Sequence, residues 1–171
     1  MKICVIGMGY VGLVSAACFA DLGNNVWCVD KNNKKINLLN NNHIPFFEPG
    51  LEELVNKNYL SGRLKFTTNL NLAVTNSDVL FICVGTPKLK KSRSADLQHV
   101  FNVARELGKY IDKFKIIVTK STVPITTGDK IEELILKKKR KKLFEVVSNP
   151  EFLREGEAIR DFRFPDRVVV G

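Results

Sequence analysis

The chain has 171 residues, 44% of them hydrophobic, and a formal net charge of +9 from 27 Lys and Arg against 18 Asp and Glu. This length suffices for one sizeable core, so we expect one domain. No apolar run approaches the roughly 18 residues of a membrane-spanning helix, and Gly7, Gly9 and Gly12 interrupt the first apolar segment, so we expect neither a membrane segment nor a signal peptide and, by default, a cytoplasmic location.

Strand and helix patterns alternate along the chain. In order they predict strand 2–6, helix 10–22, strand 25–29, helix 32–41, helix 50–55, strand 64–67, helix 70–75, strand 79–84, helix 96–111, strand 115–119, helix 127–138, strand 144–147, helix 156–161 and strand 167–170. The apolar run 79–84 is typical of a central parallel strand. This alternation predicts an α/β fold: a Rossmann-like, doubly wound, mostly parallel sheet with helices on both faces.

Residues 7–12 read Gly-Met-Gly-Tyr-Val-Gly and directly follow the first predicted strand. Such a turn exposes backbone N–H groups at a helix N-terminus, where a pyrophosphate can bind. The first glycine allows the tight turn, the second allows the ligand to approach, and the third lets the helix pack closely on the strand. The turn therefore predicts a dinucleotide site, and the alternative is a purely structural turn.

Asp30 ends the second predicted strand, near the offset of about 20 residues expected for a ribose-binding acid. A carboxylate at this position can accept both ribose hydroxyls and disfavours a 2′-phosphate. We therefore expect NAD rather than NADP.

Polar residues also follow the later predicted strands. They are Gly85-Thr86-Pro87, Ser121-Thr122 and Asn149-Pro150-Glu151. Ligands of open α/β sheets bind outside the carboxyl ends of the strands. Turns alone would not require Thr86, Thr122 and Glu151 at one edge, so the pattern favours a ligand-binding edge.

The cysteines and histidines argue against a metal site. No pair of cysteines shows metal-ligand spacing, and each lies in an apolar run, at Cys4, Cys18, Cys28 and Cys83. We expect buried, reduced thiols. The two histidines, His43 and His99, are far apart in sequence and have no evident ligand cluster.

Much of the positive charge lies in two clusters: the run 137–142, and Lys88, Lys90, Lys91 and Arg93. A nucleic-acid interface is one interpretation. However, no aromatic residues are interleaved and no nucleic-acid motif is present. Because the run follows a predicted helix, favourable interaction with the helix C-terminus is the preferred interpretation, and no nucleic-acid partner is expected.

Six segments together resemble one family of enzymes. They are Gly7–Gly12, Glu48–Glu52, Val84–Pro87, Ser94–Leu97, Lys120–Pro124 and Asn149–Gly156. The chain is similar to the N-terminal NAD-binding domain of the UDP-glucose/GDP-mannose dehydrogenase family, in particular its UDP-glucose 6-dehydrogenases. Ser94 and Thr126 stand where the family usually has glycine, which affects local loop geometry.

The resemblance implies oxidation of the C6 alcohol of a nucleotide sugar to a carboxylate with two NAD. The first hydride transfer gives an aldehyde, which a cysteine captures as a thiohemiacetal. The second gives a thioester, which water hydrolyses. Covalent capture retains the reactive aldehyde and divides a difficult oxidation into easier steps.

The resemblance also implies roles for individual residues. Cofactor-binding residues would be Gly7, Gly9, Tyr10, Val11 and Gly12 around the pyrophosphate, Asp30 and Lys35 at the adenosine, Thr86 and Thr122 at the nicotinamide, and Glu155. Glu151 would hold or activate the hydrolytic water with help from Thr122, and these two are the catalytic candidates. Substrate contacts would come from Glu151, Phe152, Leu153, Arg154 and Glu155. An alternative for Glu155 is a helix-start acid favoured by the dipole.

The family's nucleophilic cysteine lies in a later domain, and none of the four cysteines here matches it. We therefore expect residues 1–171 to be one NAD-binding domain of a longer, homo-oligomeric enzyme whose central helix and C-terminal substrate domain lie outside the chain. Alone it should bind NAD without turning over UDP-glucose. Alternatives are a GDP-mannose or UDP-N-acetylhexosamine dehydrogenase, which differ in substrate, and a non-catalytic NAD-sensing domain, which would not need the segments 120–124 and 149–156.

Overall fold

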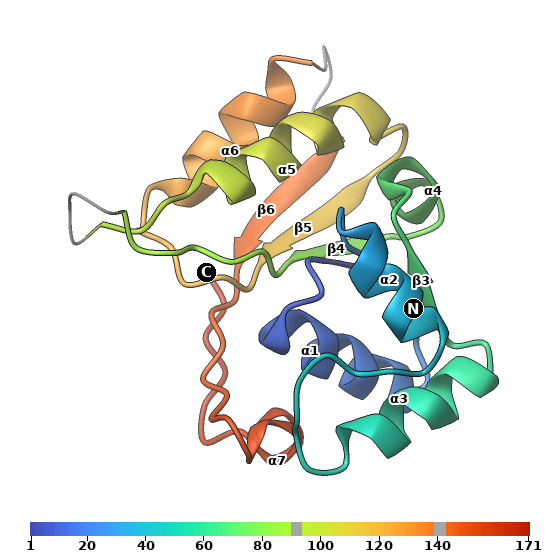
Figure 1. The fold of residues 1–171 in the computed structure, drawn as a ribbon. Helices are drawn as coiled ribbons and strands as arrows, with labels where there is room; N and C mark the ends of the chain where they lie inside the picture. Colours follow the sequence, from blue (N-terminus) through green and yellow to red (C-terminus); the bar gives the residue numbers. More distant parts are fainter. Residues whose placement is uncertain (90–93, 139–142) are drawn as a thin grey trace.

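The computed structural model describes residues 1–89, 94–138 and 143–171. They form a parallel sheet covered by helices on both faces, which confirms the predicted Rossmann-like, doubly wound α/β fold (Figure 1). The strands are β1 (Lys2–Ile6), β2 (Asn25–Val29), β3 (Leu64–Thr67), β4 (Val79–Ile82), β5 (Lys115–Thr119) and β6 (Phe144–Ser148). The helices are α1 (Tyr10–Asp21), α2 (Asn33–Asn40), α3 (Leu51–Leu60), α4 (Leu70–Thr75), α5 (Gln98–Tyr110), α6 (Thr127–Leu136) and α7 (Ala158–Arg163).

The strand order is β3-β2-β1-β4-β5-β6, and every adjacent pair is parallel. The chain begins in the middle of the sheet, moves outward to β3 and then crosses back to β4 on the other side of β1. The order therefore reverses between β1 and β4. In open α/β sheets a ligand binds at such a reversal, outside the carboxyl ends of the strands.

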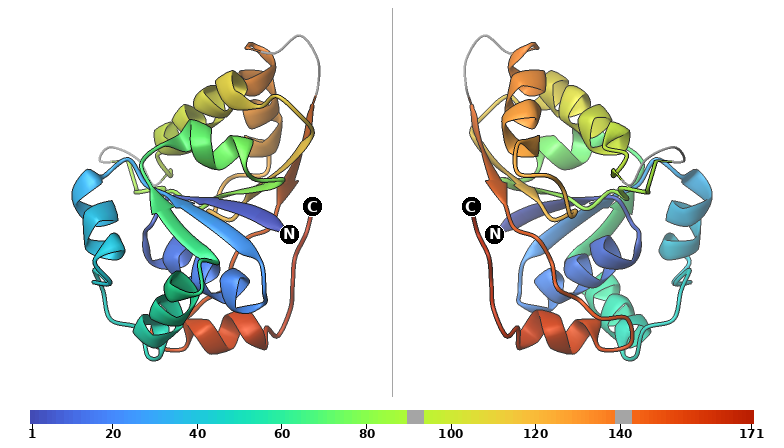
Figure 2. Two further views of the ribbon diagram at one scale, coloured as in Figure 1. Left: turned by 90° about the vertical axis from the view of Figure 1, so that its right-hand side faces the viewer. Right: turned by 90° about the vertical axis from the view of Figure 1, so that its left-hand side faces the viewer.

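Alternating side chains of the strands face two separate cores. Ile3 and Val5 pack with α1 and α3 on one face, whereas Cys4 and Ile6 pack with α4, α5 and α6 on the other. Figure 2 shows these two helical layers on either side of the sheet, with α7 beside α1 and α3. Because the central strands β1 and β4 are buried on both faces, their sequences are almost continuously apolar.

Asparagine side chains begin two of the helices, because a short polar side chain can accept a hydrogen bond from a backbone N–H of the first helical turn. Asn69 accepts such a bond from the Leu72 N–H at 3.0 Å and so caps α4. Asn32 accepts from the Lys35 N–H at 3.2 Å and so places α2 directly after the end of β2. The start of α2 is thereby held beside Asp30.

Several predicted bounds were wrong. The helix predicted as 50–55 spans Leu51–Leu60, and the one predicted from residue 96 begins at Gln98. The segment 167–170 is not a strand of the sheet, although Ser148 and Gly171 exchange backbone hydrogen bonds of 2.7 and 2.9 Å. The last helix begins at Ala158 instead of residue 156, because Gly156 has a φ of +88° and belongs to a turn. The strand predicted to reach residue 84 ends at Ile82, where the chain leaves the sheet and passes the glycine turn.

Candidate functional site

The glycines of the 7–12 turn have three different environments. A Cβ on Gly7, where φ is +101°, would lie 2.8 Å from the Cys83 carbonyl oxygen, and a Cβ on Gly12 would lie 1.8 Å from the Gly7 carbonyl oxygen. No atom lies within 4 Å of the position of a Cβ on Gly9. Packing therefore requires glycine at 7 and 12, whereas Gly9 begins α1 with its backbone open to a ligand.

Asp30 is held by three donors at the end of β2. Its Oδ2 accepts from the Met8 N–H and from the Lys35 ammonium, both at 2.9 Å, and its Oδ1 accepts from the Asn32 N–H at 2.9 Å. Burial raises the pKa of Asp30, but these hydrogen bonds outweigh it and hold the pKa below its usual range. The side chain is therefore an oriented carboxylate beside the glycine turn.

A pocket of about 500 Å³ joins the glycine turn to Asp30. Lys35 and Gly85 also line it, so the structure brings the predicted adenosine-side residues to one cavity. Its opposite wall is formed by α5, through His99, Asn102 and Glu106. The sequence did not indicate these three residues, because a polar helix face gives no sign of which cavity it borders.

Thr86 and Thr122 come together at the ends of β4 and β5. The Thr86 hydroxyl lies 3.4 Å from the Thr122 carbonyl oxygen. Between the two strand ends, the Ser121 hydroxyl donates to the Val84 carbonyl oxygen at 2.7 Å. The predicted nicotinamide-side residues are thus neighbours at the edge that also carries the glycine turn.

A second pocket, of about 730 Å³, is lined by the segment that follows β6. Glu151, Phe152, Leu153 and Arg154 all border it, together with Lys120. Glu151 is fixed by its own chain, because its Oε2 accepts from the Leu153 N–H at 2.6 Å. On the outer wall, the Arg167 guanidinium lies 4.8 Å from the centre of the Phe152 ring.

Lys120 lines the second pocket and lies close enough to Cys83, which lines the first, to interact with it electrostatically. Its ammonium donates to the Asn149 Oδ1 at 3.3 Å, and burial lowers its pKa although the nearby Cys83 and Glu151 act to raise it. Cys83 borders the first pocket but is 7% exposed, and burial raises the pKa of its thiol to about 12. At neutral pH Cys83 is a thiol and therefore a weak nucleophile.

Arg154 does not extend freely into the second pocket. Its guanidinium forms two hydrogen bonds with the Asp161 carboxylate, of 2.7 and 3.0 Å, and its backbone N–H donates to the same carboxylate at 2.9 Å. These bonds lower the pKa of Asp161 to about 2. The pair ties the predicted substrate segment to α7.

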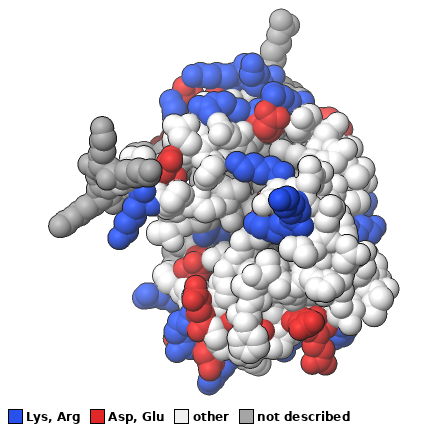
Figure 3. Space-filling model, in the orientation of Figure 1, with Lys and Arg blue, Asp and Glu red and all other residues white. Residues whose placement is uncertain are grey.

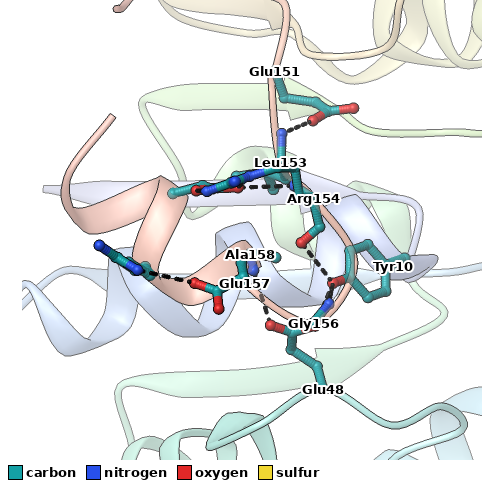
Figure 4. Close-up of polar contacts among 10 residues, drawn as sticks. Tyr10, Glu48, Glu151, Leu153, Arg154, Gly156, Glu157 and Ala158 are labelled. Carbon is teal, nitrogen blue, oxygen red and sulfur yellow. Dashed lines mark hydrogen bonds and ion pairs between the residues drawn. The ribbon is translucent and has the colours of Figure 1, made fainter. Parts of the chain in front are cut away.

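Tyr10 and Glu48 connect α1 with the turn before α7 (Figure 4). The Tyr10 hydroxyl donates to the Glu48 Oε2, which also accepts from the Gly156 N–H at 2.8 Å, and the Glu48 Oε1 accepts from the Ala158 N–H at 2.9 Å. Burial and the bond to Glu48 raise the pKa of Tyr10 to about 12. Glu155 is exposed on this turn, close enough to Tyr10 to raise its pKa further.

The basic clusters are only partly within the described residues, which leave out Lys90, Lys91, Arg93 and 139–142. Figure 3 shows Lys and Arg side chains gathered over the end of the molecule that carries α5 and α6. Lys137 pairs with Glu133 at 2.9 Å and Lys109 with Glu106 at 2.5 Å. These pairs fit the interpretation of a solvated helix surface.

Metal-binding clusters and membrane-spanning helices are both absent from the part of the chain that the structure describes. No group of three or more His, Cys, Asp or Glu side chains there is arranged to hold a metal ion. Within the same residues, no helix combines the length and apolar character needed to cross a bilayer.

Comparison with known proteins identifies what the chain is similar to. The model of the UDP-glucose/GDP-mannose dehydrogenase family, NAD binding domain, matches residues 1–171. The whole chain is 54% identical over 171 residues to a UDP-glucose 6-dehydrogenase of Rhizobium meliloti, covering 39% of that relative. It is 47% identical over 175 residues to one of Pseudomonas aeruginosa, again over 100% of the chain and 38% of the relative.

Solved structures of two dehydrogenases share the fold. A ternary complex of GDP-mannose dehydrogenase from Pseudomonas aeruginosa superposes with a TM-score of 0.95 at 42% identity, over 100% of this chain and 41% of that one. A UDP-glucose dehydrogenase from Pyrobaculum islandicum superposes with a TM-score of 0.94 at 41% identity, over 99% of this chain and 40% of that one. The chain thus spans about two fifths of the length of these relatives.

Proposed function

The chain belongs to the UDP-glucose/GDP-mannose dehydrogenase family as an NAD-binding domain, and from this we propose that its protein oxidises the C6 alcohol of UDP-glucose to a carboxylate with two NAD. The observation that carries the proposal is that Lys120, which lines the Glu151 pocket, interacts electrostatically both with Glu151 and with Cys83, which lines the glycine-turn pocket. A cofactor and a second ligand can approach each other there.

The first pocket fits NAD. Gly9 leaves the start of α1 accessible to a pyrophosphate, and Gly7, Tyr10, Val11 and Gly12 would form the rest of the turn around it. Asp30 has lone pairs beyond its three bonds that can accept ribose hydroxyls, and Lys35 holds the carboxylate in place. When bound, NAD supplies the hydride acceptor. Thr86 and Thr122 would lie beside its nicotinamide.

Glu151 and Thr122 are the proposed catalytic residues within this chain. The Leu153 N–H fixes one oxygen of Glu151, which leaves the other free to accept a proton from water. We assign Glu151 to holding the water that hydrolyses the thioester, and Thr122 to positioning it. Glu151, Phe152, Leu153, Arg154 and Glu155 would contact the nucleotide sugar, with Arg154 acting through its pair with Asp161.

The nucleophilic cysteine is assigned to a part of the protein outside these 171 residues. Cys83 borders the NAD pocket, but its raised pKa makes it unsuited to attack an aldehyde. The matched relatives are more than twice as long as this chain, which leaves room for a substrate domain. We also propose a cytoplasmic homo-oligomer with a UDP-sugar substrate and no nucleic-acid partner.

The test is a spectrophotometric assay of the full protein with NAD and one nucleotide sugar at a time. We expect two NADH for each UDP-glucose consumed and a kcat/KM for UDP-glucose at least about tenfold above those for GDP-mannose and UDP-N-acetylglucosamine. NAD binding without NADH formation from any of the three would overturn the dehydrogenase and favour a sensing domain. A preference for GDP-mannose, whose dehydrogenase shares the fold at TM-score 0.95, would show that GDP-mannose and not UDP-glucose is the substrate.

A further inference from the structure

Glu48 is a buried carboxylate with no assigned role. It is 4% exposed, and its two oxygens accept hydrogen bonds from the Tyr10 hydroxyl and from the Gly156 and Ala158 N–H groups. These donors come from two distant parts of the chain, since Tyr10 and Gly156 are 146 residues apart. Figure 4 shows Glu48 reaching from its own loop to the point where these parts meet.

Contacts other than those of Glu48 also attach α7 to the rest of the domain. The rings of Phe19 and Phe162 pack edge to face at 5.1 Å, and Arg163 pairs with Asp21 at 2.7 Å, so α7 is already held against α1. A buried carboxylate is also a weak means of stabilising a fold, because its desolvation offsets most of the gain from its hydrogen bonds. Glu48 therefore also sets the geometry of the segment that carries its donors.

The geometry that Glu48 sets is that of the 154–158 turn. This turn needs Gly156 in a left-handed conformation and carries Glu155 on its surface. The Gly156 N–H lies between the Glu48 Oε2 at 2.8 Å and the Tyr10 hydroxyl at 3.3 Å. Tyr10 is the first residue of α1, the helix whose start faces the NAD pocket. Glu48 thus fixes the end of the substrate segment relative to the start of the cofactor-binding helix.

We propose that Glu48 is a positioning residue, which acts through Tyr10 and the 154–158 turn to place the nucleotide-sugar segment 151–155 against the NAD cleft. The inference rests on the proposed function for the identity of the substrate. It does not require that Glu48 touch either ligand. Its observable consequence is a change in KM for the nucleotide sugar that is not matched by a change in NAD binding.

The main variant is Glu48→Gln, which keeps the shape of the side chain but replaces one acceptor oxygen with an NH₂ donor. Either orientation of the amide then directs a donor at a backbone N–H, of Gly156 or of Ala158. We expect the KM for UDP-glucose to rise about tenfold, as for one buried donor left without its acceptor. The Kd for NAD and the kcat should change less than about twofold, because Asp30 and the glycine turn are untouched.

Two further variants separate positioning from simple destabilisation. Glu52→Gln makes the same change at an exposed carboxylate in the first turn of α3. It should leave the KM for UDP-glucose and the Kd for NAD unaltered. Tyr10→Phe removes only the hydroxyl, and when combined with Glu48→Gln it should raise KM no further than Glu48→Gln alone, because both changes break one connection. Hydrogen exchange at the Gly156 and Ala158 amides should accelerate in Glu48→Gln while exchange in β1 remains slow.

The outcomes are distinguishable. Wild-type protein that does not turn over UDP-glucose would overturn the proposed function, and the exchange of the Gly156 and Ala158 amides would then decide whether Glu48 holds the turn. Active wild-type protein together with an unaltered KM in Glu48→Gln would overturn the role of Glu48 alone. A lower melting temperature with unchanged KM and exchange rates would show that Glu48 is structural.

Discussion

At the scale of single residues, the glycine turn divides its work between packing and access. Gly7 and Gly12 are required because backbone oxygens occupy the space that a side chain would need. Gly9 is required only if a ligand approaches, because the space beside it is empty. Two chemically identical substitutions in one turn should therefore fail for different reasons.

Gly12→Ala should lower the free energy of unfolding by more than about 3 kcal/mol, because its Cβ would overlap the Gly7 carbonyl. Gly9→Ala should leave the melting temperature nearly unchanged. It should weaken NAD binding at least about tenfold, because its methyl group blocks the pyrophosphate. Thermal unfolding and calorimetric NAD titration of both variants check this. Equal loss of stability in the two would contradict it.

Asp30→Ala should weaken NAD binding about 10- to 100-fold, because it removes the charged acceptor that the Lys35 ammonium and two backbone N–H groups orient. It should also reduce the discrimination against NADP, because no anion then opposes the 2′-phosphate. Quenching of Trp27 in β2 gives the affinities. Asp78→Asn, an exposed acid at the opposite edge of the sheet, is the control and should bind NAD as the wild type does.

At the scale of elements, the segment 151–155 owes its shape to contacts with the short helix after it. Arg154 is bound to Asp161 through its guanidinium and its backbone N–H, and Glu48 holds the intervening turn. The segment between Glu151 and α7 has no regular secondary structure of its own. Side-chain hydrogen bonds therefore fix the conformation of this segment, whereas backbone hydrogen bonds between strands fix that of the sheet.

The Arg154–Asp161 connection should depend on pH in a defined direction. Hydrogen bonds from Arg154 hold the pKa of Asp161 at about 2, below the value of about 3.9 expected in the unfolded chain. Its stabilising contribution is therefore complete above about pH 4 and is lost as the pH falls toward 2. Asp161→Asn should lower the melting temperature at pH 7, and the difference from wild type should disappear near pH 2. Asp112→Asn, at an exposed residue beyond α5, should show no such trend.

At the scale of the whole molecule, the reversal of strand order between β1 and β4 brings both pockets to one edge. The glycine turn follows β1, Thr86 follows β4, Thr122 follows β5 and Glu151 follows β6, so residues from four strands meet there. Parallel connectivity is what makes this possible, because every carboxyl end points the same way.

The 171-residue chain alone should bind NAD and form no UDP-glucuronate from UDP-glucose. The domain holds the residues proposed for the cofactor, but its thiols are buried, and the pKa of Cys83 and Cys18 is raised to about 12. Calorimetry with NAD checks the expected binding, and chromatographic detection of UDP-glucuronate checks the expected lack of turnover. Product formed by the isolated chain would show that the nucleophile lies within it.

Sequence patterns within short segments of the chain were sufficient to predict most of the fold. Apolar runs bounded by glycine and polar residues located β1, β2 and β3, because these signals act between residues close in sequence. Segment 167–170 was misassigned because its apolar residues are typical of a strand, whereas the backbone pairing with Ser148 is made by Gly171, the residue after the segment. Whether an apolar stretch joins a sheet depends on distant partners.

By itself, the sequence determined the α/β class, the glycine turn with an acid at the end of the next strand, and the resemblance that the family match confirms. Only the tertiary structure decided that Arg154 is bound to Asp161, that α5 forms a wall of the first pocket, and that Glu48 joins Tyr10 to the turn before α7. The physical reason is distance along the chain. A periodicity or a cap is encoded within a few residues, whereas these contacts exist only after folding has brought remote segments together and excluded water between them.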